Sequence, residues 1–161
     1  MPRTTNKHSL LNLKAIHRLE EVGVEYRLIE LSNRAYTVSD VVRFSEGKLK
    51  IDEICKTIIM KDNDGFYAVL LLGDDRIDFK KLKKMRESKP RIADGGEVSE
   101  VAGVEPGAVC PLILDIPLIV DPAVFSREKV NFGSGHHLYG LEMAPQDINK
   151  VVEYKSENIA R

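Results

Sequence analysis

Apolar residues recur with helical spacing in several short segments of the chain. The first segment runs from Leu10 to Val22, and Gly23 ends it. Thr37 and Asp40 fit a capping box, which predicts a helix that continues to about Phe44. Further helices are expected from Asp78 to Glu87, from Glu97 to Ala102 with Gly103 as its left-handed end, and from Pro145 onward.

Other segments have the alternation or the short apolar runs that are typical of strands. Residues 56–60 and 66–72 flank the turn signal Asp64-Gly65 and predict a β-hairpin. Further strands are expected at residues 24–31, 91–93, 112–114, 118–120 and 138–143. Helices and strands do not alternate regularly, which favours an α+β fold with a mixed or antiparallel sheet over a parallel one.

The composition is that of one globular domain. The chain has 161 residues, of which 43% are hydrophobic and 30% charged. No repeat or linker divides it, so we expect a flexible terminus at residues 1–9 and one domain at residues 10–161. The longest apolar stretch, residues 112–120, contains Asp115 and is far shorter than the ~20 residues of a membrane span, so no membrane partner is expected.

Cysteine usage gives no sign of a metal site or a disulfide framework. Cys55 and Cys110 lack metal-type spacing, which favours reduced thiols and a cytoplasmic protein. Cys110 has no histidine in a clear catalytic arrangement, so we expect it to be a small core residue rather than a nucleophile.

Residues 103–111 form the most constrained connection in the sequence. Pro106-Gly107 is typical of the centre of a type II turn, where proline presets φ and glycine supplies a positive φ. Such a loop holds backbone N–H and C=O groups in fixed directions, so it can bind a small ligand or an oxyanion. A plain helix-to-strand connection is the alternative interpretation.

Lys56 is a charged residue in an apolar strand. It shares a face with Ile58 and Met60, whereas Thr57 alternates to the opposite face. A lysine on a buried face needs a partner or a path to solvent. It is therefore either an edge residue that discourages aggregation or a cation in a binding pocket.

Positive charge is concentrated in one segment, although the net charge is only −1. Residues 80–91 carry seven lysines and arginines against Glu87 alone, so they form a candidate phosphate-binding surface. Lys80, Lys81 and Lys84 are the candidate tRNA-binding residues. A solvated helix face is the alternative interpretation.

The sequence offers no complete metal site or acid–base pair. His136 and His137 are adjacent, and on a strand they would point to opposite faces. No cysteine or carboxylate cluster completes a zinc site, and Asp74-Asp75 is expected to be a turn. We therefore expect neither metal nor cofactor, and a hydrolase of this sequence would need a substrate that supplies much of the chemistry.

An ordered set of motifs resembles the YbaK/prolyl-tRNA synthetase-associated editing-domain family over residues 10–150. The set consists of Lys56-Thr57, the apolar run that ends at Gly73, the loop at residues 103–111, and Gly133-Ser134-Gly135. The resemblance implies a curved, barrel-like, mostly antiparallel mixed sheet with helices around it. It also implies hydrolysis of the aminoacyl ester of mischarged tRNA, with help from a ribose hydroxyl and an ordered water. The binding partners that it implies are mischarged tRNA and an aminoacyl-tRNA synthetase.

The same resemblance assigns roles to particular residues. Lys56 would anchor the terminal nucleotide with Thr57 beside it, and Gly133, Ser134 and Gly135 would shape the pocket wall. The backbone of the proline-glycine loop would hold the aminoacyl carbonyl and the water; its residues are Gly103, Val104, Glu105, Pro106, Gly107 and Ala108.

The chain departs from the family pattern at two positions. Members that clear cysteine from tRNA have a serine at the position of Gly133 and an aspartate near Gly140, which argues against a cysteinyl substrate here. Two other classes remain open: a non-catalytic module that binds tRNA or a synthetase, and a small-molecule-binding protein on the same scaffold.

Overall fold

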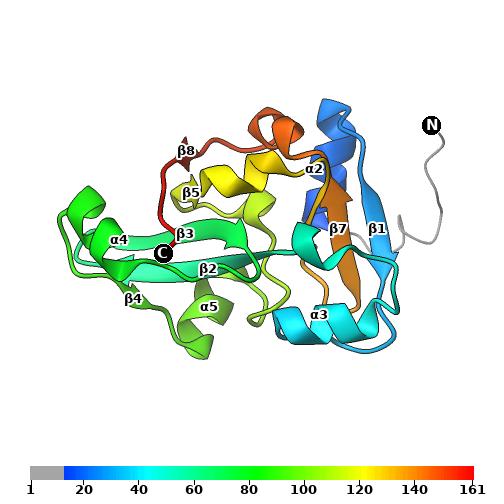
Figure 1. Ribbon diagram of the computed structural model, residues 1–161, viewed down its shortest axis with the longest axis horizontal. Coiled ribbons are helices and arrows are strands. Elements are labelled where there is room, and N and C mark those ends of the chain that lie inside the picture. Colours follow the sequence, from blue (N-terminus) through cyan, green and yellow to red (C-terminus); the bar gives the residue numbers. More distant parts are fainter. Residues whose placement is uncertain (1–12) are drawn as a thin grey trace.

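The computed structural model describes residues 13–161 as two β-sheets with helices packed around them (Figure 1). The expected flexible terminus at residues 1–9 lies outside the described residues, as does the beginning of the helix expected from Leu10. The described part of that helix is α2, Lys14–Val22, and Gly23 ends it with φ 75°. In the described residues, no helix is long and apolar enough to cross a membrane.

The larger sheet has the strand order β4-β2-β3-β5-β8. Its centre is the expected hairpin of β2, Cys55–Asp62, and β3, Gly65–Leu72. β4, Arg91–Ile92, pairs antiparallel with β2. The other edge is parallel: β5, Leu118–Val120, lies beside β3, and β8, Lys155–Ser156, lies beside β5.

The smaller sheet is antiparallel throughout. β7, Tyr139–Met143, lies between β1, Arg27–Glu30, and β6, Val130–Gly133. An isolated parallel bridge between Ile54 and Asn131 joins β6 to the residue that precedes β2. The expected curved, mostly antiparallel mixed sheet is thus formed by two sheets that meet at this bridge, and the α+β fold class is confirmed.

Side-chain caps begin three of the described helices, two of them where the sequence indicates. Thr37 accepts a hydrogen bond from the Asp40 N–H at the start of α3, Val38–Phe44. Asp78 caps α4, Phe79–Arg86. Asp94 and Glu97 form a reciprocal capping box, so α5 spans Gly95–Ala102 and begins two residues earlier than expected.

Two segments that begin with proline differ in type from the expected elements. Residues 112–114 are not a strand, because Pro111 begins the 3-10 helix η2, Pro111–Ile113. Pro145 does occupy the first position of its segment, but η4, Pro145–Lys150, is a 3-10 helix. The strands β6 and β8 and the 3-10 helices η1, Ile51–Glu53, and η3, Pro122–Ser126, were not anticipated.

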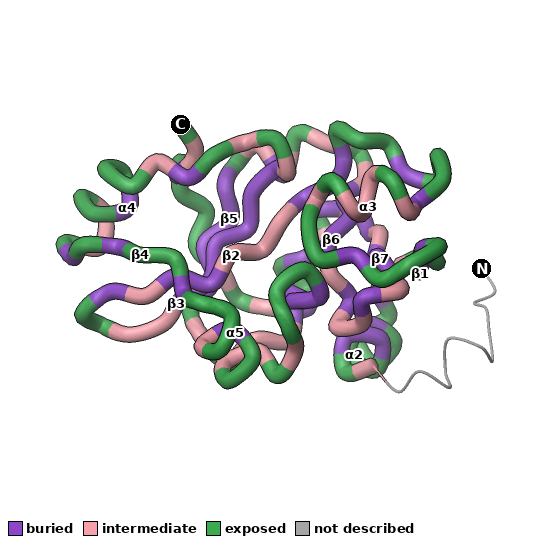
Figure 2. The backbone as a smooth tube through the Cα atoms, turned by 90° about the horizontal axis from the view of Figure 1, so that it is seen from below, coloured by how far each residue is buried: buried purple, intermediate pink, exposed green. Residues whose placement is uncertain are grey.

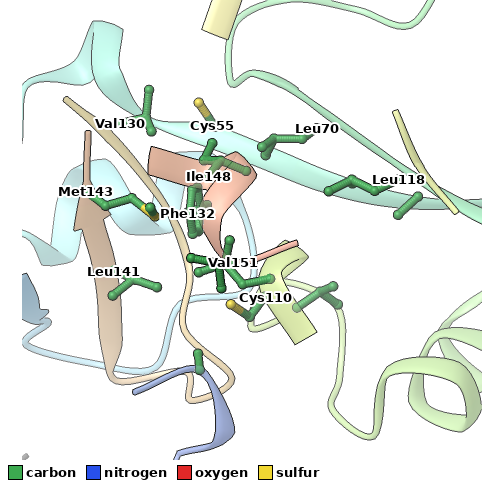
Figure 3. Packing of buried hydrophobic residues seen from close by; sticks show 14 of the residues in the cluster. Cys55, Leu70, Cys110, Leu118, Val130, Phe132, Leu141, Met143, Ile148 and Val151 are labelled. Atoms are coloured by element: carbon green, nitrogen blue, oxygen red, sulfur yellow. The ribbon is translucent and has the colours of Figure 1, made fainter. Parts of the chain in front are cut away.

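The core has three parts. The largest fills the space between the sheets and includes Phe132, Leu141 and Met143 (Figure 3). A second part packs on the other face of the hairpin, where β3 and β5 are buried strands (Figure 2). The third is small: Ile29, Leu49 and Ile54 pack with the valines of α3. This third cluster borders the cavity described next.

Candidate functional site

A cavity of about 250 Å³ lies where the two sheets meet. Its walls come from the start of β2, α3 with the residues before it, the proline-glycine loop, and the paired strands β6 and β7. These segments are far apart in sequence, so the site is a product of the tertiary fold. The lining residues used below are Tyr36, Val38, Val41, Leu49, Ile54, Lys56, Thr57, Pro106, Gly107, Asn131, Gly133, His136, His137 and Gly140.

An open edge of β2 forms one wall. β2 pairs with β3 along its whole length, but its other edge pairs with β4 only at Met60 and Lys61. The carbonyl of Ile59 accepts a hydrogen bond from the Ala93 N–H on that other edge. Because backbone groups alternate along a strand, the N–H and C=O of Thr57 point to this same edge, where no backbone group of residues 13–161 pairs with them. Lys56 and Thr57 therefore both border the cavity, although their side chains lie on opposite faces.

The Lys56 ammonium is partly buried and lies at the mouth of the cavity. Burial lowers its pKa from the ordinary value, while the negative charge of Asp75 opposes that shift. No carboxylate of the described residues forms an ion pair with it. Lys56 also borders an open groove that contains Arg76 and Phe79. Its charge is available to an oxygen or phosphate that lies between the cavity and the groove.

The proline-glycine loop forms the expected turn. The Ala108 N–H donates to the Glu105 carbonyl over 3.2 Å, and Gly107 has φ 98°, as a type II turn requires. A Cβ on Gly107 would lie 2.5 Å from Cα of Tyr36. Glycine is therefore needed because the loop packs directly on the backbone of the segment that leads into α3.

Two glycines pair across β6 and β7 and leave the floor of the cavity without side chains. Gly133 lies opposite Gly140 in the strand register, and both border the cavity. A Cβ on Gly133 would overlap the Val109 carbonyl oxygen. A Cβ on Gly140 would meet only Cβ of Ile29, at 3.9 Å. The first glycine permits close backbone packing, whereas the second leaves space in the cavity.

The two histidines lie in the turn before β7, not on a strand. The alternation of side chains along a strand therefore does not apply to them, because β7 begins at Tyr139, and both residues border the cavity. His137 is buried and its ring centroid lies 4.5 Å from that of Tyr36. Within residues 13–161, no cluster of three or more histidine, cysteine, aspartate or glutamate side chains could hold a metal ion.

The surroundings of His136 favour its neutral imidazole form over the charged one. Its Nδ1 accepts a hydrogen bond from the Leu138 N–H over 3.1 Å, so in the neutral ring the proton resides on Nε2. Burial lowers its pKa, and the charges of Arg34 and His137 lower it further. The ring can therefore present a neutral N–H donor at the cavity wall.

The structure brings together five of the candidate residues: Lys56, Thr57, Pro106, Gly107 and Gly133 border the cavity. Gly103, Val104 and Glu105 belong to the same loop but do not line it. Three others support the wall from behind: the Gly135 N–H donates to the Ala108 carbonyl over 2.8 Å, and the Ser134 hydroxyl donates to the Tyr139 carbonyl over 2.7 Å.

Tyr36 and Asn131 border the cavity but were not predicted from the sequence. Tyr36 lines the cavity because the loop at Gly107 packs against its backbone. Asn131 lies between Val130 and Phe132 on an unanticipated strand. A single polar residue between two apolar ones is the signal that could have identified it.

Both thiols are buried, as expected for Cys110. Burial raises the pKa of both Cys55 and Cys110 to about 12. Neither thiol would be a thiolate near neutral pH, which agrees with a packing role.

The basic residues of α4 lie outside the cavity and are not equivalent. Lys80, Lys83 and Lys84 border a shallow hollow. Lys81 instead donates to Asn158 Oδ1 and to the Ala160 carbonyl, at 3.1 and 2.8 Å. Arg86 is bound to Asp62 at 2.6 Å and lies over the Tyr67 ring. Part of the basic segment therefore stabilises the fold.

Comparison with known proteins gives consistent matches. The family model of the aminoacyl-tRNA editing domain matches residues 32–151. A proline–tRNA ligase of Caldicellulosiruptor saccharolyticus is 25% identical over 126 residues, which cover 74% of this chain but only 21% of the ligase. The chain thus spans about a fifth of that relative.

Solved structures share the whole fold. One, described as a hypothetical protein, has a TM-score of 0.82 and 28% identity and covers 92% of this chain and 100% of its own. A second is described as a candidate trans-editing enzyme for prolyl tRNA synthetase and has a TM-score of 0.78 and 19% identity. The match covers 92% of this chain and 98% of that structure's chain. At that identity, the second likeness shows the fold alone.

Proposed function

Because the chain belongs to the aminoacyl-tRNA editing domain family, we propose that it hydrolyses the aminoacyl ester of mischarged tRNA in trans, after release from a synthetase. The observation that carries the proposal is the cavity itself. It combines one partly buried lysine, an unpaired strand edge and a rigid glycine turn within about 250 Å³. A space of this size suits a small aminoacyl group rather than a large one.

The proposed reaction needs no protein nucleophile. Water attacks the carbonyl carbon of the ester, the bond from that carbon to the ribose oxygen breaks, and the ribose oxygen takes up a proton. The products are the free amino acid and a tRNA with its terminal hydroxyl restored. An aminoacyl ester is already activated, so positioning and electrostatic stabilisation can supply the rate enhancement.

In this proposal the charged group of the cavity anchors the tRNA end, and its backbone groups contact the aminoacyl group. The Lys56 ammonium binds ribose or phosphate oxygens at the cavity mouth, where the open groove begins. The backbone at Gly107 and the unpaired edge at Thr57 face the aminoacyl group, and the Thr57 N–H would stabilise charge that develops on the carbonyl oxygen.

The fold also supports a role for α4 in tRNA binding. Lys80, Lys83 and Lys84 share one hollow and would bind phosphates of the tRNA outside the cavity. Since a ligase relative contains a related segment, a synthetase is the proposed source of the mischarged tRNA.

The proposal is tested by multiple-turnover deacylation of a panel of charged tRNAs that includes alanyl, cysteinyl, seryl, threonyl and prolyl esters. Release of amino acid in molar excess over protein, lost in Lys56→Ala, is the expected result. Binding of tRNA without turnover of any ester would instead support a non-catalytic tRNA-binding module.

A further inference from the structure

Two polar side chains at the cavity have no hydrogen-bond partner among the described residues. They are the Thr57 hydroxyl and the Asn131 amide, of which both the oxygen and the nitrogen are unpaired. Asn131 is only 1% exposed, and both residues border the cavity. A buried polar group without a partner destabilises a fold, so its retention at a cavity points to a ligand that completes it.

The strand register directs Asn131 toward the cavity floor. Val130 and Phe132, its neighbours on β6, point into the large core cluster (Figure 3), so the Asn131 side chain lies on the opposite face. Gly133 lies two residues along on this same face, and its cross-strand partner is Gly140. The amide therefore lies beside the part of the floor that has no side chains.

The charged residue opposite Asn131 in the strand register does not satisfy its amide. Glu142 is its cross-strand partner, but Arg27 binds the Glu142 carboxylate in two hydrogen bonds of 3.0 and 3.2 Å. The facing wall is apolar and consists of Val38, Val41, Leu49 and Ile54. Since no group of the described residues pairs with the Asn131 amide, a molecule bound in the cavity can supply its hydrogen bonds.

The chemistry of the unpaired atoms restricts the ligand group. The Asn131 amide offers one acceptor oxygen and one donor nitrogen, and a hydroxyl can both donate and accept. An α-ammonium group has donors only and would leave the amide N–H unpaired. It would also need a carboxylate in this buried position, and Glu142 is already paired with Arg27.

We propose that Asn131, together with Thr57 on the same cavity lining, recognises a hydroxyl on the side chain of the aminoacyl group, so that seryl and threonyl esters are preferred over alanyl and valyl esters. The proposal rests on the aminoacyl-tRNA function proposed above and names its substrate class. A site built to hydrogen-bond a hydroxyl discriminates against an analogue that lacks it, because the buried groups are then left unpaired.

Binding provides the first test and does not require turnover. The probes are non-hydrolysable amide analogues of seryl- and alanyl-adenosine, measured by calorimetry. The seryl analogue should bind roughly tenfold more tightly to the wild type. Asn131→Leu and Thr57→Val, which keep side-chain size, should each reduce that ratio toward one. A ratio near one in the wild type, or one that Asn131→Leu leaves unchanged, overturns the proposal.

Hydrolysis provides the second test and separates this proposal from the broader one. Threonyl- and valyl-tRNA esters have side chains of nearly equal shape, so their ratio of kcat/KM isolates the hydroxyl. We expect a preference for threonyl over valyl that falls in Asn131→Leu. If both rates fall equally in that variant, Asn131 binds a part common to all esters, such as the ribose, and the proposal fails. If no ester is hydrolysed, the deacylase function fails, and the analogue-binding ratio alone decides this proposal.

Two controls keep the interpretation specific. Asn131→Leu removes unpaired buried polar atoms, so its Tm should equal or exceed that of the wild type; a collapse of the fold would instead assign Asn131 a structural role and overturn the proposal. Val41→Ala alters the apolar wall without touching a hydrogen-bonding group. It should change seryl and alanyl binding by similar factors.

Discussion

The α3 end and the α4 end of the molecule lie at opposite sides of the fold (Figure 1) and are built on different principles. At the α3 end, glycines and an open strand edge bring backbone groups together around a cavity. At the α4 end, long charged side chains project from a helix and border only a shallow hollow. The first region depends on close backbone packing that leaves no room for a Cβ at Gly107 or Gly133, whereas the second depends on charge spread over a surface. Single substitutions should therefore have large effects at the first and small effects at the second.

The largest effect is expected for Lys56→Ala. Removal of the ammonium at the cavity mouth should reduce kcat/KM for deacylation by about 100-fold or more, because a charged group that positions the substrate is lost. Since Lys56 has no ion-pair partner among the described residues, its Tm should change little. Lys61→Ala is the matched control on the same strand: Lys61 lies over the Phe66 ring and 3.9 Å from Glu97, outside the cavity. Equal loss of activity in both variants would contradict the assignment of Lys56.

Gly107→Ala should be the most damaging glycine substitution. The added Cβ would lie 2.5 Å from Cα of Tyr36, in addition to the strain of φ 98°, so we expect lower stability by about 2 kcal/mol or more and a loss of deacylation. Gly103→Ala separates the two causes, because Gly103 has φ 74° but no atom within 4 Å of the new Cβ. It should lose only about 1 kcal/mol, as measured by chemical denaturation. Equal losses would show that the Tyr36 contact does not matter.

Gly140→Ala should reduce activity with little cost in stability. The new methyl group would meet only Ile29 at 3.9 Å and would occupy space in the cavity, so kcat/KM should fall by roughly tenfold, and most for the larger esters. Gly133→Ala, at the paired position, should instead lower Tm, because its Cβ overlaps the Val109 carbonyl. A Gly140→Ala protein with full activity toward every ester would show that the floor of the cavity is not part of the site.

The pH dependence of deacylation should show whether the reaction requires the protonated form of Lys56. Burial lowers its pKa, so the ammonium is fully present below that pKa and is lost as pH rises through it. Deacylation, corrected for spontaneous ester hydrolysis, should therefore decline on the alkaline side at a lower pH than an ordinary lysine would give. In Lys56→Arg the decline should move to higher pH, because guanidinium stays protonated. An identical alkaline limb in both proteins would exclude Lys56 as its cause.

The smallest effect is expected at the α4 end. Charge reversal of Lys80, Lys83 and Lys84 should raise KM for charged tRNA several-fold and change kcat little. Each lost phosphate contact should lower the log–log salt slope by roughly 0.7 to 0.9. Lys81→Glu alone is the informative comparison, because its ammonium binds Asn158 and the Ala160 carbonyl; it should lower Tm instead. Unchanged KM and salt slope in the triple variant would place tRNA on another surface.

The sequence by itself determined the elements whose signals are local. Capping by Thr37 and Asp78, the hairpin of β2 and β3, and the turn at Pro106-Gly107 all depend on neighbouring residues, and all were predicted. Local signals failed where proline competes with strand formation, as at Pro111, and where a strand has a polar residue and a glycine, as in β6.

Only the tertiary structure decided the composition of the cavity. Lys56 and Thr57 both border it because β4 pairs with β2 at two residues only, which leaves a strand edge accessible from both faces. Tyr36, Asn131 and the histidine pair reach it through contacts between segments about 30 to 100 residues apart, and no periodicity records such contacts. The sequence fixes which groups the chain possesses, whereas packing and strand register determine which of them face one another, because those depend on the whole fold at once.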